Sequence, residues 1–133
     1  MPDDVSFTHG MLSRRRESAR ALYQADHFYN EGGLSFQDNA PVKTLELGIR
    51  CVDQALNIYA ENGCMVEMAY AAVILCRGYK YYWEQTKDAS TLDKMKEKLQ
   101  LAAEYLTLDE HKGMYTYALS LHAWLDEVAK VGE

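Results

Sequence analysis

Residues 64–85, CMVEMAYAAVILCRGYKYYWEQ, are the long stretch of this chain with the most apolar surface to bury. Apolar residues recur here at the three- and four-residue steps of a helix that faces a core. They are Met65, Met68, Ala69, Ala72, Leu75, Cys76, Tyr79, Tyr82 and Trp83. The opposite side is also largely apolar, with Tyr70, Val73, Ile74 and Tyr81. Because a helix that is apolar on most sides packs against several neighbours, we expect this helix to be central.

The composition of the whole chain favours one all-α domain. Its 133 residues are 48% hydrophobic and 26% charged, as in ordinary globular proteins, and the length suits a single domain. Pro2 and Pro41 are the only prolines, and both lie outside the periodic segments. Since proline interrupts helices, this scarcity and the helical periodicity together predict a fold without strands.

We expect five antiparallel helices, stacked as consecutive helical hairpins. Their predicted ranges are 13–31, 41–61, 64–87, 90–107 and 114–131. Residues 1–12 are expected to form a flexible N-terminal arm, followed by a single all-helical domain of residues 13–133.

Residues typical of helix ends fix these boundaries. Glycine adopts the left-handed conformation that ends many helices, so Gly32-Gly33 and Asn62-Gly63 are predicted to end the first two. Ser90 or Thr91 is predicted to cap the start of the fourth helix through its hydroxyl group.

The charge of the chain argues against two classes of partner. The net charge is −6 and the pI is about 5.2. Nucleic acids and anionic membranes favour clustered lysine and arginine, so we expect neither as a partner. The short basic run of residues 14–16 is more typical of a solvated first helical turn.

The cysteines and the hydropathy indicate a cytoplasmic protein. Cys51, Cys64 and Cys76 are odd in number and match no zinc-binding spacing, so we expect reduced, largely buried thiols. The first ten residues lack the apolar core of a signal peptide. No run approaches the roughly 18–20 apolar residues that a membrane span needs.

Two helix pairs of the sequence look alike when they are aligned. The second helix of each pair carries a small or slim residue, a larger apolar residue and an alanine at four- and three-residue steps. These are Gly48, Val52 and Ala55 in one pair, and Met95, Leu99 and Ala102 in the other. Such steps allow the close helix contacts that a helical-repeat solenoid requires.

This pattern resembles the tetratricopeptide repeat family over about residues 17–107. In that family a small residue stands midway along the first helix, aromatic residues follow, and a glycine closes the turn. The matching residues are Ala25, Phe28, Tyr29 and Gly32, with Cys76 and Tyr79 in the second pair. The resemblance implies stacked hairpins with a groove lined by the first helix of each pair. The cationic clamp by which some members hold chaperone tails is not reproduced, so the resemblance implies no particular partner.

No catalytic motif is present in the chain, and we expect a protein that is not an enzyme and has no cofactor. There is no nucleophile elbow, phosphate-binding loop, dinucleotide fingerprint or HExxH motif. His27 with Glu31, and His122 with Asp126, are spaced to share a helix face. Such single pairs are more typical of surface hydrogen bonds, so we expect no metal.

The aromatic residues near the end of the central helix indicate the function. Tyr79, Tyr81, Tyr82 and Trp83 point all around the helix, so they cannot all face one core. Either the flanking hairpins cover them, or they line a groove of the kind that tyrosine and tryptophan anchor in protein interfaces. Arg77 and Lys80 would border such a groove and suit an acidic or carboxylate-bearing peptide.

We therefore predict a protein-interaction module, an adaptor or scaffold that binds a peptide or partner helix. The predicted partner-binding residues are Asp26, Tyr29, Asn30, Tyr70, Val73, Arg77, Lys80 and Tyr81. The alternative is a structural role, in which a homodimer or assembly subunit uses the same aromatic surface to bind itself.

Overall fold

The described part of the chain, residues 12–131 of a computed structural model, is all-helical, with five helices and no strand. Side chains are described for residues 19–130. The helices are α1 (Leu12–Leu34), α2 (Val42–Glu61), α3 (Met65–Thr86), α4 (Ala89–Ala103) and α5 (Lys112–Val131). The predicted all-α class and number of helices are thus confirmed. The expected arm lies outside the described residues, except for Leu12 in α1, and so do the side chains of the basic run 14–16.

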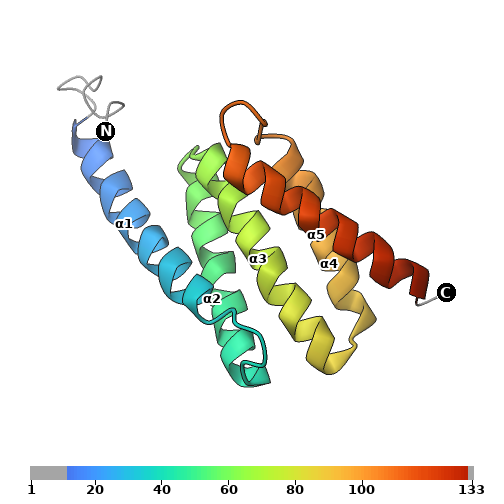
Figure 1. The fold of residues 1–133 in the computed structure, drawn as a ribbon. Helices are drawn as coiled ribbons and strands as arrows, with labels where there is room; N and C mark the ends of the chain where they lie inside the picture. The colour runs from blue at the N-terminus through green and yellow to red at the C-terminus, as the bar shows by residue number, and fades with distance from the viewer. Residues whose placement is uncertain (1–11, 132–133) are drawn as a thin grey trace.

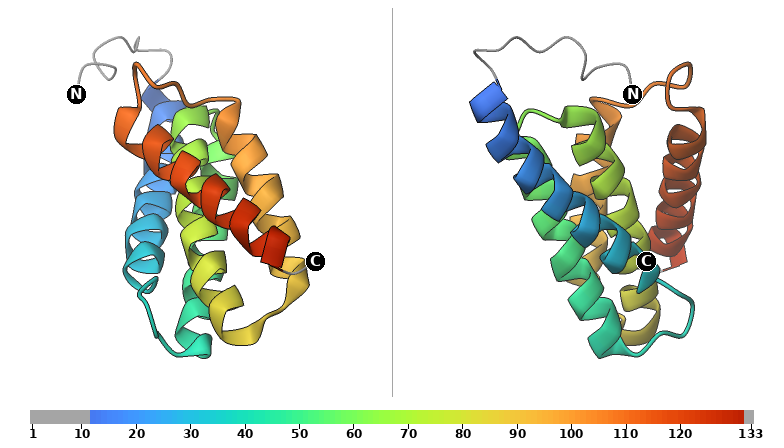
Figure 2. Two further views of the ribbon diagram at one scale, coloured as in Figure 1. Left: turned by 45° about the vertical axis from the view of Figure 1, so that its right-hand side comes forward. Right: turned by 90° about the vertical axis from the view of Figure 1, so that its left-hand side faces the viewer.

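The helices from α1 to α4 pack side by side as consecutive antiparallel hairpins (Figure 1). α1 lies along α2, α2 along α3, and α3 along α4, each with an extensive contact. α5 crosses the outer side of α3 and α4 and contacts both much more sparingly (Figure 2). Because α3 touches all four other helices, the prediction of a central helix is confirmed.

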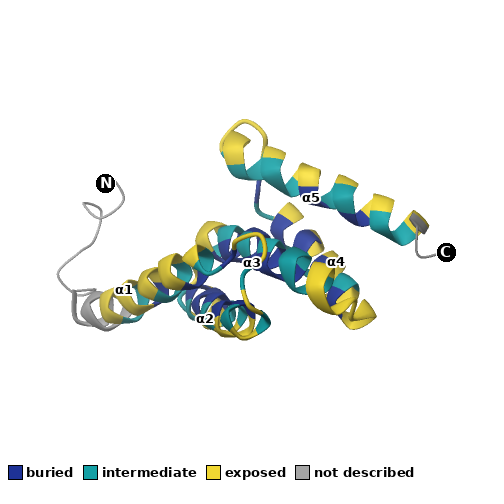
Figure 3. Ribbon diagram, turned by 60° about the horizontal axis from the view of Figure 1, so that its bottom comes forward, coloured by how far each residue is buried: buried dark blue, intermediate teal, exposed yellow. Residues whose placement is uncertain are grey.

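The hydrophobic core follows the contacts of α2, α3 and α4 (Figure 3). Its largest fully buried side chains are Phe36, Leu45, Leu75, Met95, Leu99, Leu121, Val52, Val73 and Cys76. α1 and α5 show long exposed strips on their outer sides in the same view. The sheltered centre of the molecule is therefore α3, flanked by two less covered helices.

A side chain from the α1–α2 loop joins α1, α2 and α3. Phe36 is completely buried, and its ring occupies space left by two glycines on neighbouring helices. A Cβ atom on Gly78 of α3 would lie 2.5 Å from Cε1 of Phe36, and one on Gly48 of α2 would lie 2.8 Å from the same atom. Gly32 of α1 faces Gly48 so closely that a Cβ on Gly32 would lie 2.8 Å from the Gly48 carbonyl oxygen. The three glycines thus permit backbone and ring contacts that any side chain would block.

This arrangement corrects the predicted end of the first helix. The glycine pair does not end α1, which continues to Leu34. Gly32 serves the close approach to α2 instead, and Gly63 is the glycine in the left-handed conformation, with φ of 73°. The second predicted end is confirmed, because α2 stops at Glu61, directly before Asn62 and Gly63.

The residue that ends α3 and the residue that caps α4 are also not those that sequence rules for helix ends predict. Lys87, rather than a glycine, takes the left-handed conformation after α3, with φ of 57°. Asp88, rather than Ser90 or Thr91, caps α4, because its carboxylate accepts a hydrogen bond of 3.0 Å from the backbone N–H of Ser90. The later helix ends shift modestly, with α4 stopping at Ala103 and α5 beginning at Lys112.

Candidate functional site

A cleft of about 200 Å³ lies between the last turns of α1 and the middle of α3. α1 contributes one wall and α3 the other. The lining residues are Tyr29, Asn30, Gly33, Leu34, Ile74 and Arg77. In Figure 3 this side of α3 lies between α1 and α5, the first and last helices of the chain. We call this cleft the α1–α3 groove.

Arg77 is the most unusual residue of the α1–α3 groove. Its Nε atom is buried and has no hydrogen-bond partner among the described residues. The guanidinium carbon lies 5.8 Å from the ring centre of Tyr81, one turn further along α3. A buried donor without a partner is destabilising by about 1–3 kcal/mol, more for a charged group. Arg77 therefore holds an unused, charged hydrogen-bond donor at the wall of an apolar cleft.

Two tyrosines continue this surface toward the start of α3. Burial raises the pKa of the Tyr29 hydroxyl above its ordinary value, and the nearby Tyr70 raises it further. Tyr29 consequently stays protonated at neutral pH and can donate a hydrogen bond. Tyr70 in turn contacts the ring of His111 edge-on, with ring centres 6.0 Å apart. His111 precedes α5, so this contact links the surface to the last helix.

Aromatic rings and cations join α3 to α5. Lys80 lies between two rings, with Nζ 5.9 Å from the ring centre of Tyr81 and 5.5 Å from that of Trp124. Trp83 meets Trp124 edge-on, with ring centres 5.6 Å apart and an interplanar angle of 81°. Lys87 caps the outer face of Trp83 at 4.1 Å. We call this set of contacts the α3–α5 seam, and it explains why Trp83 is half-buried rather than free to line a groove.

The structure brings together some of the predicted partner-binding residues and separates others. Tyr29, Asn30 and Arg77 line the α1–α3 groove. Lys80 and Tyr81 belong to the α3–α5 seam. Asp26 is turned toward α2, where its carboxylate accepts a short hydrogen bond from the Tyr59 hydroxyl. The eight predicted residues therefore do not form one continuous site.

The prediction for Val73 is wrong. Its side chain is 0% exposed and belongs to the core, so it cannot contact a partner. The reason is that α1, α2, α4 and α5 together cover most of the circumference of α3. An apolar residue on the opposite side from the apolar residues that recur at three- and four-residue steps is therefore buried by a second neighbouring helix.

Three residues of the α1–α3 groove were not among the predicted site residues: Gly33, Leu34 and Ile74. Leu34 is 67% exposed, so it offers apolar surface at the border of the cleft. Its signal in the sequence was missed because the helix was expected to end before it. Ile74 was identified as part of the apolar far side of α3, without being assigned to a site.

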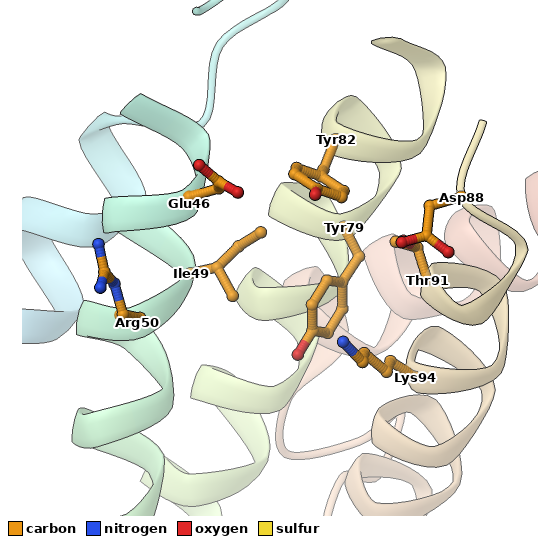
Figure 4. A pocket seen from close by; sticks show the side chains of 8 residues that line it. All are labelled: Glu46, Ile49, Arg50, Tyr79, Tyr82, Asp88, Thr91 and Lys94. Carbon is orange, nitrogen blue, oxygen red and sulfur yellow. The ribbon is translucent and has the colours of Figure 1, made fainter. Parts of the chain in front are cut away.

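A second cleft lies between α2 and α4, with α3 as its floor (Figure 4). Its volume is about 370 Å³. The lining residues are Glu46, Ile49 and Arg50 of α2, Tyr79 and Tyr82 of α3, and Asp88, Thr91 and Lys94 around the start of α4. Four of these eight carry a charge, two of each sign. We call this the α2–α4 cleft.

Comparisons of the chain with protein-family models, with curated proteins and with solved structures found no match. Within residues 12–131, no helix combines the length and hydropathy required to cross a membrane. No group of three or more histidine, cysteine, aspartate or glutamate residues in the described part of the chain is placed to hold a metal ion.

Proposed function

We propose that this chain is a non-enzymatic protein-interaction module. Its α1–α3 groove binds a peptide or partner helix, and a carboxylate of that ligand accepts hydrogen bonds from Arg77. The observation that carries the proposal is the buried Nε of Arg77, which has no hydrogen-bond partner within residues 19–130 and lies at the wall of an apolar cleft. A carboxylate can accept two parallel hydrogen bonds from one guanidinium group, including one from Nε. Such a ligand would satisfy the unused donor.

The walls of the groove indicate what should accompany the carboxylate. Leu34 and Ile74 offer apolar surface, and Tyr29 offers a ring with a hydroxyl donor. Tyrosine and arginine are typical of interface centres, where few residues supply most of the affinity, and the exposed Leu34 adds apolar surface beside them. We therefore infer a segment that presents an aspartate, a glutamate or a terminal carboxylate next to an apolar side chain.

The proposal includes a relation to the tetratricopeptide repeat family and a cytoplasmic location. Support for the first comes from the antiparallel stacking of consecutive hairpins and from the close contact of Gly32 with Gly48. Support for the second comes from Cys51 and Cys76, which are free thiols, as is common in reducing compartments.

Selection from a displayed library of random peptides tests the proposal, with the wild-type chain as bait and Arg77→Gln for counter-selection. We expect enriched peptides that contain an acidic residue beside an apolar one. Fluorescence anisotropy with an enriched peptide should show at least about a tenfold loss of affinity for Arg77→Gln, or about 1.4 kcal/mol. Lys96→Gln, on the exposed outer side of α4, should bind like the wild type.

Two outcomes would count against this assignment. Arg77 would not be the anchor if the enriched peptides lacked acidic residues and bound the Arg77→Gln variant with the same affinity as the wild type. A wild-type chain that is dimeric by light scattering, and monomeric as Leu34→Asp, would favour the structural alternative, in which a second copy covers this surface.

A further inference from the structure

We propose that the α2–α4 cleft binds a small zwitterion, an amino acid whose ammonium and carboxylate groups are separated by a short aliphatic chain. The cleft is distinct from the α1–α3 groove, because it lies between α2 and α4 and shares no lining residue with that groove. Its volume of about 370 Å³ falls within the range of small-molecule pockets. The inference stands on how charge is distributed along the cleft.

One end of the cleft suits a cation. Figure 4 shows Glu46 on the α2 side and Asp88 on the α4 side, with the ring of Tyr82 between them. Two carboxylates on opposite walls attract an ammonium group, and an aromatic face adds a cation–π contact. Ser90 donates both of its hydrogen bonds to Oδ1 of Asp88, at 3.0 Å from its N–H and 2.8 Å from its hydroxyl, so Oδ2 remains available to a ligand.

The other end of the cleft suits an anion. The ammonium group of Lys94 and the hydroxyl of Tyr79 point toward each other there, and Arg50 lies at the outer edge of the α2 wall (Figure 4). Burial, followed by the negative charge of Asp53, raises the pKa of Tyr79 to about 12. The hydroxyl is therefore protonated at neutral pH and donates to an anion. A carboxylate placed here would meet a lysine and a tyrosine donor together.

The α2 wall carries one charge of each sign, and their spacing sets the length of a ligand that lies along it. Glu46 and Arg50 are four residues apart on α2, which corresponds to about 6 Å along the helix axis. Ile49 lies between the two ends and offers apolar surface to an aliphatic chain. Among the described residues no contact ion pair joins Glu46 or Asp88 to Arg50 or Lys94. Lys94 acts on Asp88 only at longer range: the pKa of Asp88 is lowered first by the hydrogen bonds from Ser90 and, to a smaller extent, by the charge of Lys94.

Isothermal titration calorimetry with 5-aminopentanoate tests this inference, because its extended chain holds the two charges at about the required separation. Pentanoate and pentylamine are the matched probes, since each carries one of the charges on a similar chain. We expect 5-aminopentanoate to bind at least about tenfold more tightly than either probe. Binding of pentanoate or pentylamine as tight as that of 5-aminopentanoate would overturn the inference, and so would the absence of binding by 5-aminopentanoate.

Variants at the two ends separate their contributions. Glu46→Gln should weaken the binding of 5-aminopentanoate and of pentylamine at least about fivefold and leave the binding of pentanoate unchanged. Lys94→Gln should weaken the binding of 5-aminopentanoate and of pentanoate and leave the binding of pentylamine unchanged. Both side chains are exposed, so the fold should persist, as circular dichroism can verify. Lys96→Gln, outside the cleft on α4, is the control and should bind all three like the wild type. Equal losses for Lys94→Gln and Lys96→Gln would assign the effect to overall charge and overturn the site.

Discussion

The ring of Phe36 occupies the space that Gly78 leaves on α3 by having no side chain. Because Phe36 lies in the α1–α2 loop and Gly78 in the middle of α3, this contact joins residues 42 positions apart in the sequence. Gly48 makes the same kind of room for the ring from α2. The position of the first hairpin on α3 therefore depends on one aromatic ring and two absent side chains.

Gly78→Ala should destabilise the fold by about 1–3 kcal/mol, because the new methyl group overlaps the Phe36 ring. This cost opposes the gain of up to about 1 kcal/mol that alanine normally brings to a helix interior. Urea denaturation measures the difference. Gly113→Ala is the matched control, since a Cβ there meets nothing within 4 Å, and it should be neutral or slightly stabilising.

A double-mutant cycle extends this test. Phe36→Leu alone should destabilise the fold, because it shrinks a fully buried ring. Combined with Gly78→Ala, it should cost less than the sum of the two single changes, since the smaller side chain makes room for the methyl group. Additive costs would mean that the two residues are not coupled.

The contact surface of α2 should be intolerant of changes in volume. Leu56 is buried, and Ala55 is completely buried in the core. Leu56→Ala should cost about 2–5 kcal/mol through lost burial and a cavity. Ala55→Leu should cost about 1–3 kcal/mol by overpacking a close helix contact. Thermal melts like the wild type for both variants would contradict the helix register on which the repeat pattern depends.

Stability should fall in alkaline solution through Tyr79. Its pKa is about 12 in the folded chain, chiefly because of burial, whereas an unfolded tyrosine ionises near pH 10. Between about pH 10 and 12 the unfolded state loses this proton and the folded state keeps it. The unfolding free energy therefore decreases by up to about 1.4 kcal/mol per pH unit for this group, and the stabilisation is fully present below pH 10. Urea denaturation of Tyr79→Phe over this range should show a shallower slope than the wild type.

The three thiols should differ in reactivity. Cys76 is completely buried, and burial raises the pKa of its thiol well above the ordinary value, so little thiolate is present. Cys51 and Cys64 are half-buried. Labelling of the native protein with a thiol reagent should begin at Cys64, beside the turn at Gly63, and reach Cys76 only on unfolding. Rapid labelling of Cys76 under native conditions would show that α3 is not central.

Much of the fold could be predicted because each helix carries its own periodic signal. The all-α class, the number of helices and the central position of α3 follow from residue spacing alone. The end of α1 could not be predicted in this way. The local sequence predicts that Gly32 ends the helix. Its actual role is to allow close contact with Gly48, which is sixteen residues later and on another helix. Sequence rules for caps describe backbone conformation and carry no information on such contacts.

The candidate site was predicted less completely than the fold, for a related reason. Periodicity identifies which residues share a side of α3, but it does not show how many neighbouring helices cover that side. Val73 and Arg77 are four residues apart on the same side, yet Val73 is in the core and Arg77 borders a cleft. The α2–α4 cleft was missed because its charges come from segments separated by about forty residues, each of which resembles an ordinary solvated surface.

The sparing attachment of α5 has a consequence for the motions of the molecule. α5 is held by the α3–α5 seam and a small share of the core, whereas α2 and α3 are enclosed by neighbours. Amide hydrogens of α5 should therefore exchange with solvent through openings that leave the other four helices folded. The last helix is in this sense a separate, weaker cooperative unit. Its departure would expose more of the side of α3 that carries Arg77, without unfolding the hairpins beneath it.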